Sequence, residues 1–420
     1  MHREPLSLPP RRRYSSQADS KFREIVGAIA RLHEPTQTQL DNLERSYGST
    51  GEYLMECPEL REHITLVHGQ GSRMIGTLIR PSRLRAEGYD VDGVVRLREG
   101  AFSIYSGDAG PGRLIEDVYQ PLLRYARMHG LDIDRWERCV TLTYTDGMKV
   151  DITPIIAEPM VSIPFGETHA RVPDRDLRRF AVTNPMGLVN SFNEAAKVRA
   201  ILGNQIALDS LKEASARGEL EQLPDAAEVQ NRLLSRLVQL IKVHRNASFP
   251  ASSSDEPDFA PKSVFVTTLA AAAYAMRAPV PHDSELDLLL DVVQHMPTYV
   301  QREPLPGGAE HWVLANPSAP GNNLAGDMNT PAHQSAFVQW HARLVGHLEQ
   351  ILDCIEERQG LDRLLPVLED AFGSNAAGAV RELEQPQAIA GGTARSILLG
   401  TATAATVSLP VRAHNFYGKK

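Results

Sequence analysis

Apolar positions in the first part of the chain predict strands and helices arranged around a sheet. Short apolar or alternating runs predict strands over residues 91–97, 101–105, 138–145 and 148–157. The Asp146-Gly147 pair between the last two runs is typical of a hairpin turn. Apolar residues at helical spacing predict helices over residues 19–46 and 114–130. Pro121 is expected either to bend the second helix or to mark its start.

After about residue 175 the pattern becomes mostly helical. Long helices are predicted over residues 187–213, 225–245, 263–276 and 331–359. Polar loops are expected over residues 246–262 and 315–330, and residues 386–420 carry no clear pattern. We therefore expect an α+β chain with two domains, an α/β domain over residues 1–175 that includes an N-terminal helix, and a mostly helical domain over residues 176–420.

Composition is that of an ordinary globular protein and narrows the function. Of 420 residues, 42% are apolar and 23% are charged, and the formal net charge of −8 argues against a protein whose main task is coating nucleic acid. A local basic groove remains compatible with this balance. The three cysteines are far apart, which favours a reducing compartment over a zinc site or a disulfide framework. We expect neither a membrane span nor a secretory signal.

Two acids stand one residue apart in the predicted strand GYDVDGVV, where an unpaired buried carboxylate is costly. Strand geometry places residues i and i+2 on one face, so Asp90 and Asp92 point to the same place. A third acid, Asp151 in KVDITPII, lies on a separate predicted strand that could bring it to the same face. Oxygen ligands of this kind suit Mg²⁺, and three carboxylates can hold two ions for phosphoryl displacement.

The segment HGQGSRMIG upstream has the features of a phosphate cradle. Gly71 allows backbone amides to approach an anion closely, and Ser72 adds a hydroxyl donor. A helical turn beginning at Arg73 would add the attraction of a helix N-terminus. Each motif alone is a weak indicator, because acids near strand ends are commonly solvated. Their order, Gly-Ser, then Asp-x-Asp, then a third Asp in another strand, is more specific.

In this order the motifs resemble the polymerase-beta-like nucleotidyltransferases, and more closely the bacterial cGAS/DncV-like nucleotidyltransferases. The resemblance rests on QGSRMIGTLIRP, YDVDGVV and KVDITPIIA, and continues through TNPMGLVNSFN, RLVQLIKVHRN, KSVFVTTLAAAAY and NPSAPGNNLAGDM. It implies a polymerase-beta-like catalytic core with a mixed sheet, over residues 1–175. It also implies a helical nucleotide-binding domain like that of oligoadenylate synthases, over residues 176–420.

The resemblance implies a metal site and a donor-nucleotide site. Two Mg²⁺ ions, or Mn²⁺ ions, would be held by Asp90, Asp92 and Asp151, and Asp151 would also take the proton from an attacking ribose hydroxyl. Nucleotide binding would involve Gln70, Gly71, Ser72, Lys242, Ser263 and Asp327. The first five would contact the triphosphate, and Asp327 would lie near the nucleobase.

Structural alternatives exist for two of these positions, and the chain departs from its relatives in two places. Lys242 lies off the apolar stripe of its predicted helix, as a solvated lysine does, and Ser263 could be a helix N-cap. The loop PSRLRAEG before Asp90 is specific to this branch. Asn322-Asn323-Leu324 stands where relatives often carry an acid, which leaves base recognition open.

The implied function is metal-dependent synthesis of a cyclic di- or trinucleotide with release of pyrophosphate, in bacterial anti-phage (CBASS) signalling in the cytoplasm. The expected partners are ATP with GTP, UTP or CTP, and CBASS regulatory proteins, with no membrane and no indication of activation by nucleic acid. One alternative is a template-independent transferase acting on an RNA, protein or small-molecule acceptor. Another is a pseudoenzyme that binds nucleotide as a sensor or scaffold. The pocket walls that would set the bases, ring size and linkage cannot be assigned from the sequence.

Overall fold

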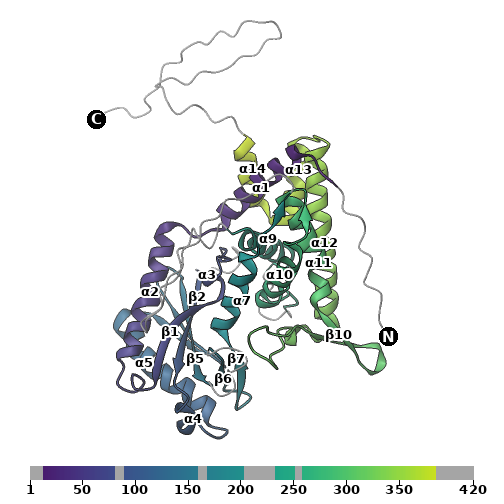
Figure 1. The fold of residues 1–420 in the computed structure, drawn as a ribbon. Helices are drawn as coiled ribbons and strands as arrows, with labels where there is room; N and C mark the ends of the chain where they lie inside the picture. Colours follow the sequence, from purple (N-terminus) through teal and green to yellow (C-terminus); the bar gives the residue numbers. More distant parts are fainter. Residues whose placement is uncertain (1–12, 81–88, 159–167, 203–231, 251–257, 385–420) are drawn as a thin grey trace, which may run out of the picture.

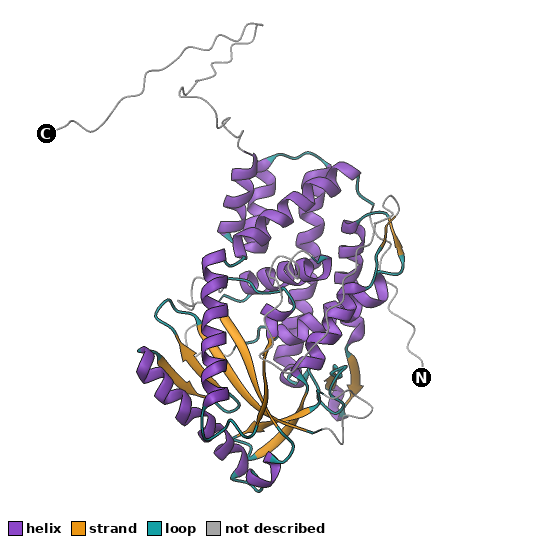
Figure 2. Cartoon of the chain, turned by 60° about the vertical axis from the view of Figure 1, so that its left-hand side comes forward, coloured by secondary structure: helices purple, strands orange, loops and turns teal. Residues whose placement is uncertain are grey.

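A mixed sheet with flanking helices forms one side of the molecule, and a helical bundle forms the other (Figures 1 and 2). The computed structural model describes residues 13–80, 89–158, 168–202, 232–250 and 258–384. This arrangement confirms the predicted α+β class. Within these ranges, no helix is both long and apolar enough to cross a membrane.

The sheet has seven strands. In spatial order, five of them are β1 (Ile64–Gln70), β2 (Asp90–Leu97), β5 (Lys149–Ala157), β4 (Val140–Thr143) and β3 (Asp132–Arg135). β6 (Ala170–Asp174) pairs with β5, and β7 (Arg179–Thr183) pairs with β6. β2 and β5 run parallel, and the other pairs are antiparallel. The predicted strands at β2, β4 and β5 are confirmed, as is the hairpin at Asp146-Gly147, where Gly147 has a φ of 82°.

The strand predicted over residues 101–105 is wrong, because this segment forms the short helix α4 (Ala101–Ile104). Ala101 and Tyr105 are buried while Ser103 between them is exposed, whereas a strand would place all three residues on one face. The predicted helix over residues 114–130 is confirmed as α5 (Gly110–His129), which continues through a buried Pro121.

The single helix predicted over residues 19–46 is also wrong, because two helices occupy this region: α1 (Ser16–His33) and α2 (Gln37–Glu56). Pro35 disfavours helical backbone at the residue before it, and Thr36 then starts α2 with a capping box. In this box Thr36 Oγ1 accepts from the Gln39 backbone N–H, and Gln39 Oε1 accepts from the Thr36 N–H.

Helices dominate the rest of the described chain. The longer ones are α7 (Pro185–Lys197), α9 (Leu233–Ser248), α10 (Ser263–Arg277), α11 (Glu285–His295), α12 (Pro331–Glu356), α13 (Leu361–Phe372) and α14 (Ser374–Glu384). The predicted helices over residues 263–276 and 331–359 are confirmed as α10 and α12. The helix predicted over residues 187–213 is confirmed at α7 but is wrong at residues 198–202, because α7 ends at Lys197 and residues 201–202 form a strand. The helix predicted over residues 225–245 is confirmed at α9. Residues 203–231 lie outside the described residues. Short strands form two further pairs, β8 (Ile201–Leu202) with β9 (Pro281–His282) and β10 (Gln301–Pro304) with β11 (Glu310–Val313).

One apolar core joins α1 to the helical half of the chain. Phe22, Ile25 and Ile29 of α1 pack in the same buried cluster as residues of α9, α10 and α12. The sheet also extends into the segment predicted as the helical domain, because its strand β7 lies after residue 175. The predicted domain division between residues 175 and 176 stays a prediction.

α9 is tied directly to the segment that follows β1. Hydroxyl, amide and ammonium groups on α9 donate to backbone carbonyls of residues 75–78: Ser235 Oγ to Ile75 O at 2.7 Å, Gln239 Nε2 to Leu78 O at 3.3 Å and Lys242 Nζ to Thr77 O at 2.8 Å. These hydrogen bonds hold one helix of the bundle beside the end of β1, so the sheet and the bundle meet at this point.

Candidate active site

Four polar side chains form a row across four adjacent strands. Gln70 of β1 lies opposite Asp92 of β2, Asp92 lies opposite Asp151 of β5, and Asp151 lies opposite Thr141 of β4. Partners in register on neighbouring strands project to the same face of a sheet, so the four side chains share one face. Asp90, two positions before Asp92, projects to that face as well. The structure therefore brings together the three acids that the sequence singled out.

The carboxyl of Asp92 lies in a strongly acidic, partly buried environment. Burial and the negative charges of Asp151 and Asp90 together raise its pKa to about 7. The positive charge of Lys242 acts in the opposite direction. A carboxyl with this pKa is only partly ionised at neutral pH, and a nearby cation would favour its charged form.

Asp151 is held by a neighbour on β4. Thr141 Oγ1 donates a hydrogen bond of 2.5 Å to Asp151 Oδ1. Burial raises the pKa of Asp151, while the Thr141 hydrogen bond and the charge of Lys149 oppose that rise. Cys139, at the start of β4, lies near the acids, and burial together with the charges of Asp151 and Asp92 raises its pKa to about 12. The Cys139 thiol is therefore neutral beside the carboxylates.

Gly71 fits against Asp92 in a way that no other residue could. Its φ is +70°, and a Cβ at this position would lie 2.0 Å from Asp92 Oδ2. The short helix α3 (Gly71–Met74) begins here, with Gln70 as its N-cap and Ser72 in its first turn. Glycine thus allows the chain to turn sharply while the Asp92 carboxylate packs directly against the turn.

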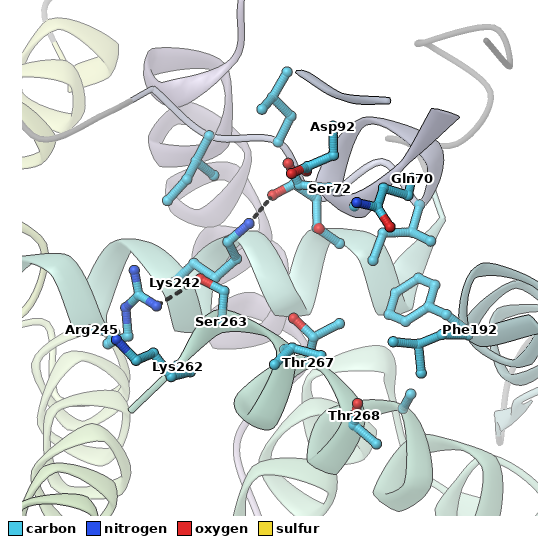
Figure 3. A pocket seen from close by; sticks show the side chains of 18 of the residues that line it. Gln70, Ser72, Asp92, Phe192, Lys242, Arg245, Lys262, Ser263, Thr267 and Thr268 are labelled. Atoms are coloured by element: carbon cyan, nitrogen blue, oxygen red, sulfur yellow. Dashed lines mark hydrogen bonds between the residues drawn. The ribbon is translucent and has the colours of Figure 1, made fainter. Parts of the chain in front are cut away.

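A cavity of about 1030 Å³ opens beside this row of side chains. Its walls come from the end of β1, from α3 and from α7, α9 and α10 (Figure 3). Eight of the nine predicted site residues line it: Gln70, Gly71, Ser72, Asp90, Asp92, Asp151, Lys242 and Ser263. The cavity is large enough for a nucleotide, since ligand pockets typically measure roughly 300–1,000 Å³.

Lys242 and Ser263 lie in this cavity, and the structural alternatives for both residues are wrong. Lys242 is 7% exposed, and in Figure 3 it points toward Asp92. Burial and the charge of Arg245 together lower its pKa to about 7, although the charge of Asp92 opposes both effects. Ser263 is the first residue of α10, whose N-cap is Lys262, and its Oγ accepts a hydrogen bond from Arg245 Nη1 at 2.7 Å.

Several cavity residues were missed by the sequence analysis. Arg245 and Lys262 add positive charge to the wall, and Thr267 and Thr268 of α10 add hydroxyl groups (Figure 3). Arg245 could have been found, because it follows Lys242 by three positions on a helix and so lies on the same face. Phe192 of α7 contributes an aromatic wall, for which its surrounding sequence gave no distinctive signal.

Asp327 is the one predicted site residue that does not line the cavity. It is exposed in the 3-10 helix over Gly326–Met328 and is not among the described residues that line the cavity. Asp258, also exposed, lines the cavity. Asn323 holds its own loop together, since its Oδ1 accepts from the Leu314 and Ala325 backbone amides. The Asn322-Asn323 departure is therefore explained by loop structure.

The donor set fits a divalent cation bound together with a phosphate ligand. In the part of the chain that the structure describes, no three His, Cys, Asp or Glu side chains already surround a common point as metal ligands do. Mg²⁺, however, is usually bound by one or two carboxylates, with substrate phosphates and water completing its shell. Asp92 and Asp151, side by side on parallel strands, supply two such carboxylates, and their acidic environment favours a cation.

The fold and this site define a nucleotidyltransferase of the polymerase-beta type, with carboxylates on a mixed sheet facing a cationic cavity. Residues 19–195 match the family model described as the Second Messenger Oligonucleotide or Dinucleotide Synthetase domain. Residues 19–195 therefore form a domain that matches this synthetase family, in agreement with the resemblance that the motifs indicated.

One solved structure of this kind has a similar fold, and two further ones match with TM-scores below 0.5. The Bradyrhizobium diazoefficiens CD-NTase CdnG in complex with GTP is 18% identical, with a TM-score of 0.60, covering 86% of this chain and 98% of that chain. The Vibrio cholerae cyclic AMP-GMP synthase DncV is 14% identical, with a TM-score of 0.49, covering 86% and 88%. Escherichia coli DncV in its 3'-deoxy GTP bound form is 14% identical, with a TM-score of 0.48, covering 86% and 89%. No curated protein sequence matches the chain.

Proposed function

We propose that this nucleotidyltransferase is a metal-dependent synthase that joins nucleoside triphosphates into a cyclic di- or trinucleotide and releases pyrophosphate. The observation that carries the proposal is the pairing of Asp92 with Asp151 at one wall of the cavity, with Lys242 and Arg245 at another. This combination suits a substrate that brings both a triphosphate and divalent cations. The synthetase family and the GTP held by CdnG support nucleoside triphosphates as the substrate class.

Binding of the donor nucleotide would use the cationic wall. The triphosphate would lie between Ser72 and the positively charged groups of Lys242 and Arg245, and Ser263 would add a hydroxyl. A triphosphate next to Lys242 would raise the pKa of this ammonium, because nearby negative charge favours the charged form. Phosphate binding would thus supply the charge that burial alone disfavours.

Asp90, Asp92 and Asp151 would hold Mg²⁺ or Mn²⁺, up to two ions. When bound, the ions would stabilise the charge that develops on the α-phosphate as pyrophosphate leaves. Asp151 would take the proton from the ribose hydroxyl of the acceptor. Since Asp151 Oδ1 accepts the Thr141 hydrogen bond, Oδ2 is the oxygen that remains for this proton. Ring closure would repeat the same transfer after the linear intermediate turns round.

Four features of this proposal rest on the family resemblance: cyclic product, metal dependence, bacterial anti-phage (CBASS) signalling and cytoplasmic location. CBASS regulatory proteins would be the partners in that setting.

The deciding experiment incubates the protein with labelled ATP, GTP, CTP and UTP and either Mg²⁺ or Mn²⁺, treats the products with phosphatase, and identifies them by mass spectrometry. We expect a phosphatase-resistant cyclic product from the wild type and from Asp108→Ala, a control at an exposed acid. We expect none from Asp92→Ala or when EDTA replaces the metal. A linear product or a labelled acceptor would instead favour template-independent transfer, and normal synthesis by Asp92→Ala would overturn the metal assignment.

A further inference from the structure

A chain of two hydrogen bonds runs from the surface to Asp151. Trp136 Nε1 donates to Thr141 Oγ1 at 3.0 Å, and Thr141 Oγ1 donates to Asp151 Oδ1 at 2.5 Å. Thr141 is 5% exposed, whereas Trp136 is 56% exposed. Neither residue is among those that line the cavity.

The chemistry of these groups gives the chain one direction. An indole N–H can only donate, so Thr141 Oγ1 must accept from Trp136. A hydroxyl has a single hydrogen, and the bond to Asp151 uses it. The pair therefore presents one fixed donor to Asp151, and it does so through a hydroxyl that cannot turn away without losing both bonds.

Backbone structure holds both members of the pair in place. Thr141 lies directly opposite Asp151 in the β4–β5 ladder, so their side chains are neighbours by register. Trp136 stands in the connection between β3 and β4, where its backbone N–H donates to Cys139 O at 2.9 Å and closes the loop. The indole therefore reaches Thr141 from a short, hydrogen-bonded loop.

We propose that Thr141 and Trp136 are positioning residues, which fix Asp151 Oδ1 with a hydrogen bond so that Oδ2 faces the ribose hydroxyl and the metal. The proposal rests on the role given to Asp151 in the proposed function. Groups that orient a metal-binding side chain commonly contribute about 10- to 100-fold in activity or metal affinity. The two residues would act through Asp151, without touching substrate themselves.

The first test separates the Thr141 hydroxyl from the packing of its side chain. Thr141→Val keeps the shape of the side chain and loses the hydroxyl, whereas Thr141→Ser keeps the hydroxyl and loses a methyl group. Thr143→Val is the control, because it makes the same change two residues further along β4, on the same face of the strand. We expect Thr141→Val to lower kcat for pyrophosphate release by about 10- to 100-fold with KM within about twofold. Thr141→Ser and Thr143→Val should stay within about threefold of wild type.

Thr141→Val as active as Thr141→Ser would overturn the proposal, and so would an equal loss in Thr143→Val. Trp136→Phe keeps a ring and loses the indole N–H, and we expect about a 3- to 10-fold lower kcat from it. Unchanged kcat in Trp136→Phe would remove Trp136 from the pair.

The second test does not need enzyme activity. Of the three tryptophans Trp136 is exposed, whereas Trp312 and Trp340 are 1% and 0% exposed, so quenching of tryptophan fluorescence by Mn²⁺ reports mainly on the neighbourhood of Asp151. Trp136→Phe should abolish the quenching and so confirm its source. We expect Thr141→Val to need about tenfold more Mn²⁺ than wild type for half-quenching, and Thr141→Ser to need the same amount as wild type.

The two tests distinguish failure of this proposal from failure of the proposed function. A wild type that releases no pyrophosphate would refute the function, and the Mn²⁺ titration would then decide the positioning role alone. Equal Mn²⁺ midpoints for Thr141→Val and Thr141→Ser would overturn it. Thermal unfolding of each variant verifies that the comparison is made between folded proteins.

Discussion

Replacing Gly71 by alanine would place a methyl group where the Asp92 carboxylate now packs. The new Cβ would lie 2.0 Å from Asp92 Oδ2 and 2.9 Å from Asp92 Cγ. The backbone at Gly71 also has a φ of +70°, which disfavours any residue with a Cβ. Gly71→Ala therefore combines a general backbone strain with a specific displacement of one carboxylate.

The two effects have different sizes and different readouts. Left-handed backbone costs a residue with a Cβ roughly 1–2 kcal/mol of folding stability. To reach an ordinary contact of 3.4 Å, Asp92 Oδ2 must move by about 1.4 Å. A displacement of only about 1 Å at a catalytic group can lower the rate by about 100-fold. That fall corresponds to about 2.7 kcal/mol in activation free energy. We expect a modest loss of stability and a large loss of kcat.

Gly130→Ala is the matched control. Gly130 ends α5 with a φ of +65°, and a Cβ there would meet no atom within 4 Å. It should lose a similar amount of stability and keep its kcat within about twofold, because only the strain is shared. Pyrophosphate release measures kcat, and urea unfolding measures stability. Full activity in Gly71→Ala, or an equal loss of activity in Gly130→Ala, would refute the reasoning.

Three further predictions concern charge. Lys242→Met removes a buried cation while keeping its apolar stem, so KM for the nucleoside triphosphate should rise about 10- to 100-fold, which is the contribution of a hydrogen bond to a charged group. The same change at exposed Lys197 should leave KM unaltered. Equal KM values in the two variants would contradict the assignment of Lys242 to phosphate binding. Asp92 has a folded-state pKa of about 7, above the unfolded value of 3.8, so stability is lost as pH rises from the unfolded value through the folded value. In EDTA, Asp92→Asn should therefore unfold at a higher urea concentration than wild type at pH 8 but not at pH 4. A wild type that is the more stable of the two at pH 8 would disprove this effect. Burial lowers the pKa of His244 from 6.5 to about 3, so the unfolded chain takes up a proton first and stability falls as pH drops below about 6.5. His244→Gln should flatten the dependence of unfolding free energy on pH by up to about 1.4 kcal/mol per pH unit. An unchanged slope would count against this role of His244.

Local geometry explains where the sequence predictions succeeded. The alternation around Asp90 and Asp92 identified β2, and it also placed both acids on one face because a strand repeats every two residues. Asp146-Gly147 identified the β4–β5 hairpin, because few residue pairs adopt the backbone of so tight a turn. A five-residue run such as 101–105 is too short to distinguish strand from helix by spacing, and there the prediction was wrong.

Site residues brought together by long-range packing were harder to predict. Nothing in the surrounding sequence distinguishes buried Lys242 from a solvated lysine, because its burial depends on how α9 packs beside residues 75–78. Arg245 can be predicted to line the cavity only once the face of α9 that carries Lys242 is known to face the cavity. Asp327 was expected near the nucleobase by resemblance, but it is exposed in a short 3-10 helix and does not line the cavity.

By itself, the sequence identified the three acids and the Gly-Ser turn, because these depend on residue type and on spacing within one strand or turn. The class of protein followed from the resemblance that these motifs carry in their order along the chain. Tertiary structure alone decided that β2 and β5 run parallel in a register that sets Asp92 opposite Asp151. It also decided that Gly71 packs against Asp92 and that Trp136 reaches Asp151 through Thr141. The physical reason is that spacing within an element is fixed by backbone geometry, whereas alignment between elements is fixed by how their side chains pack.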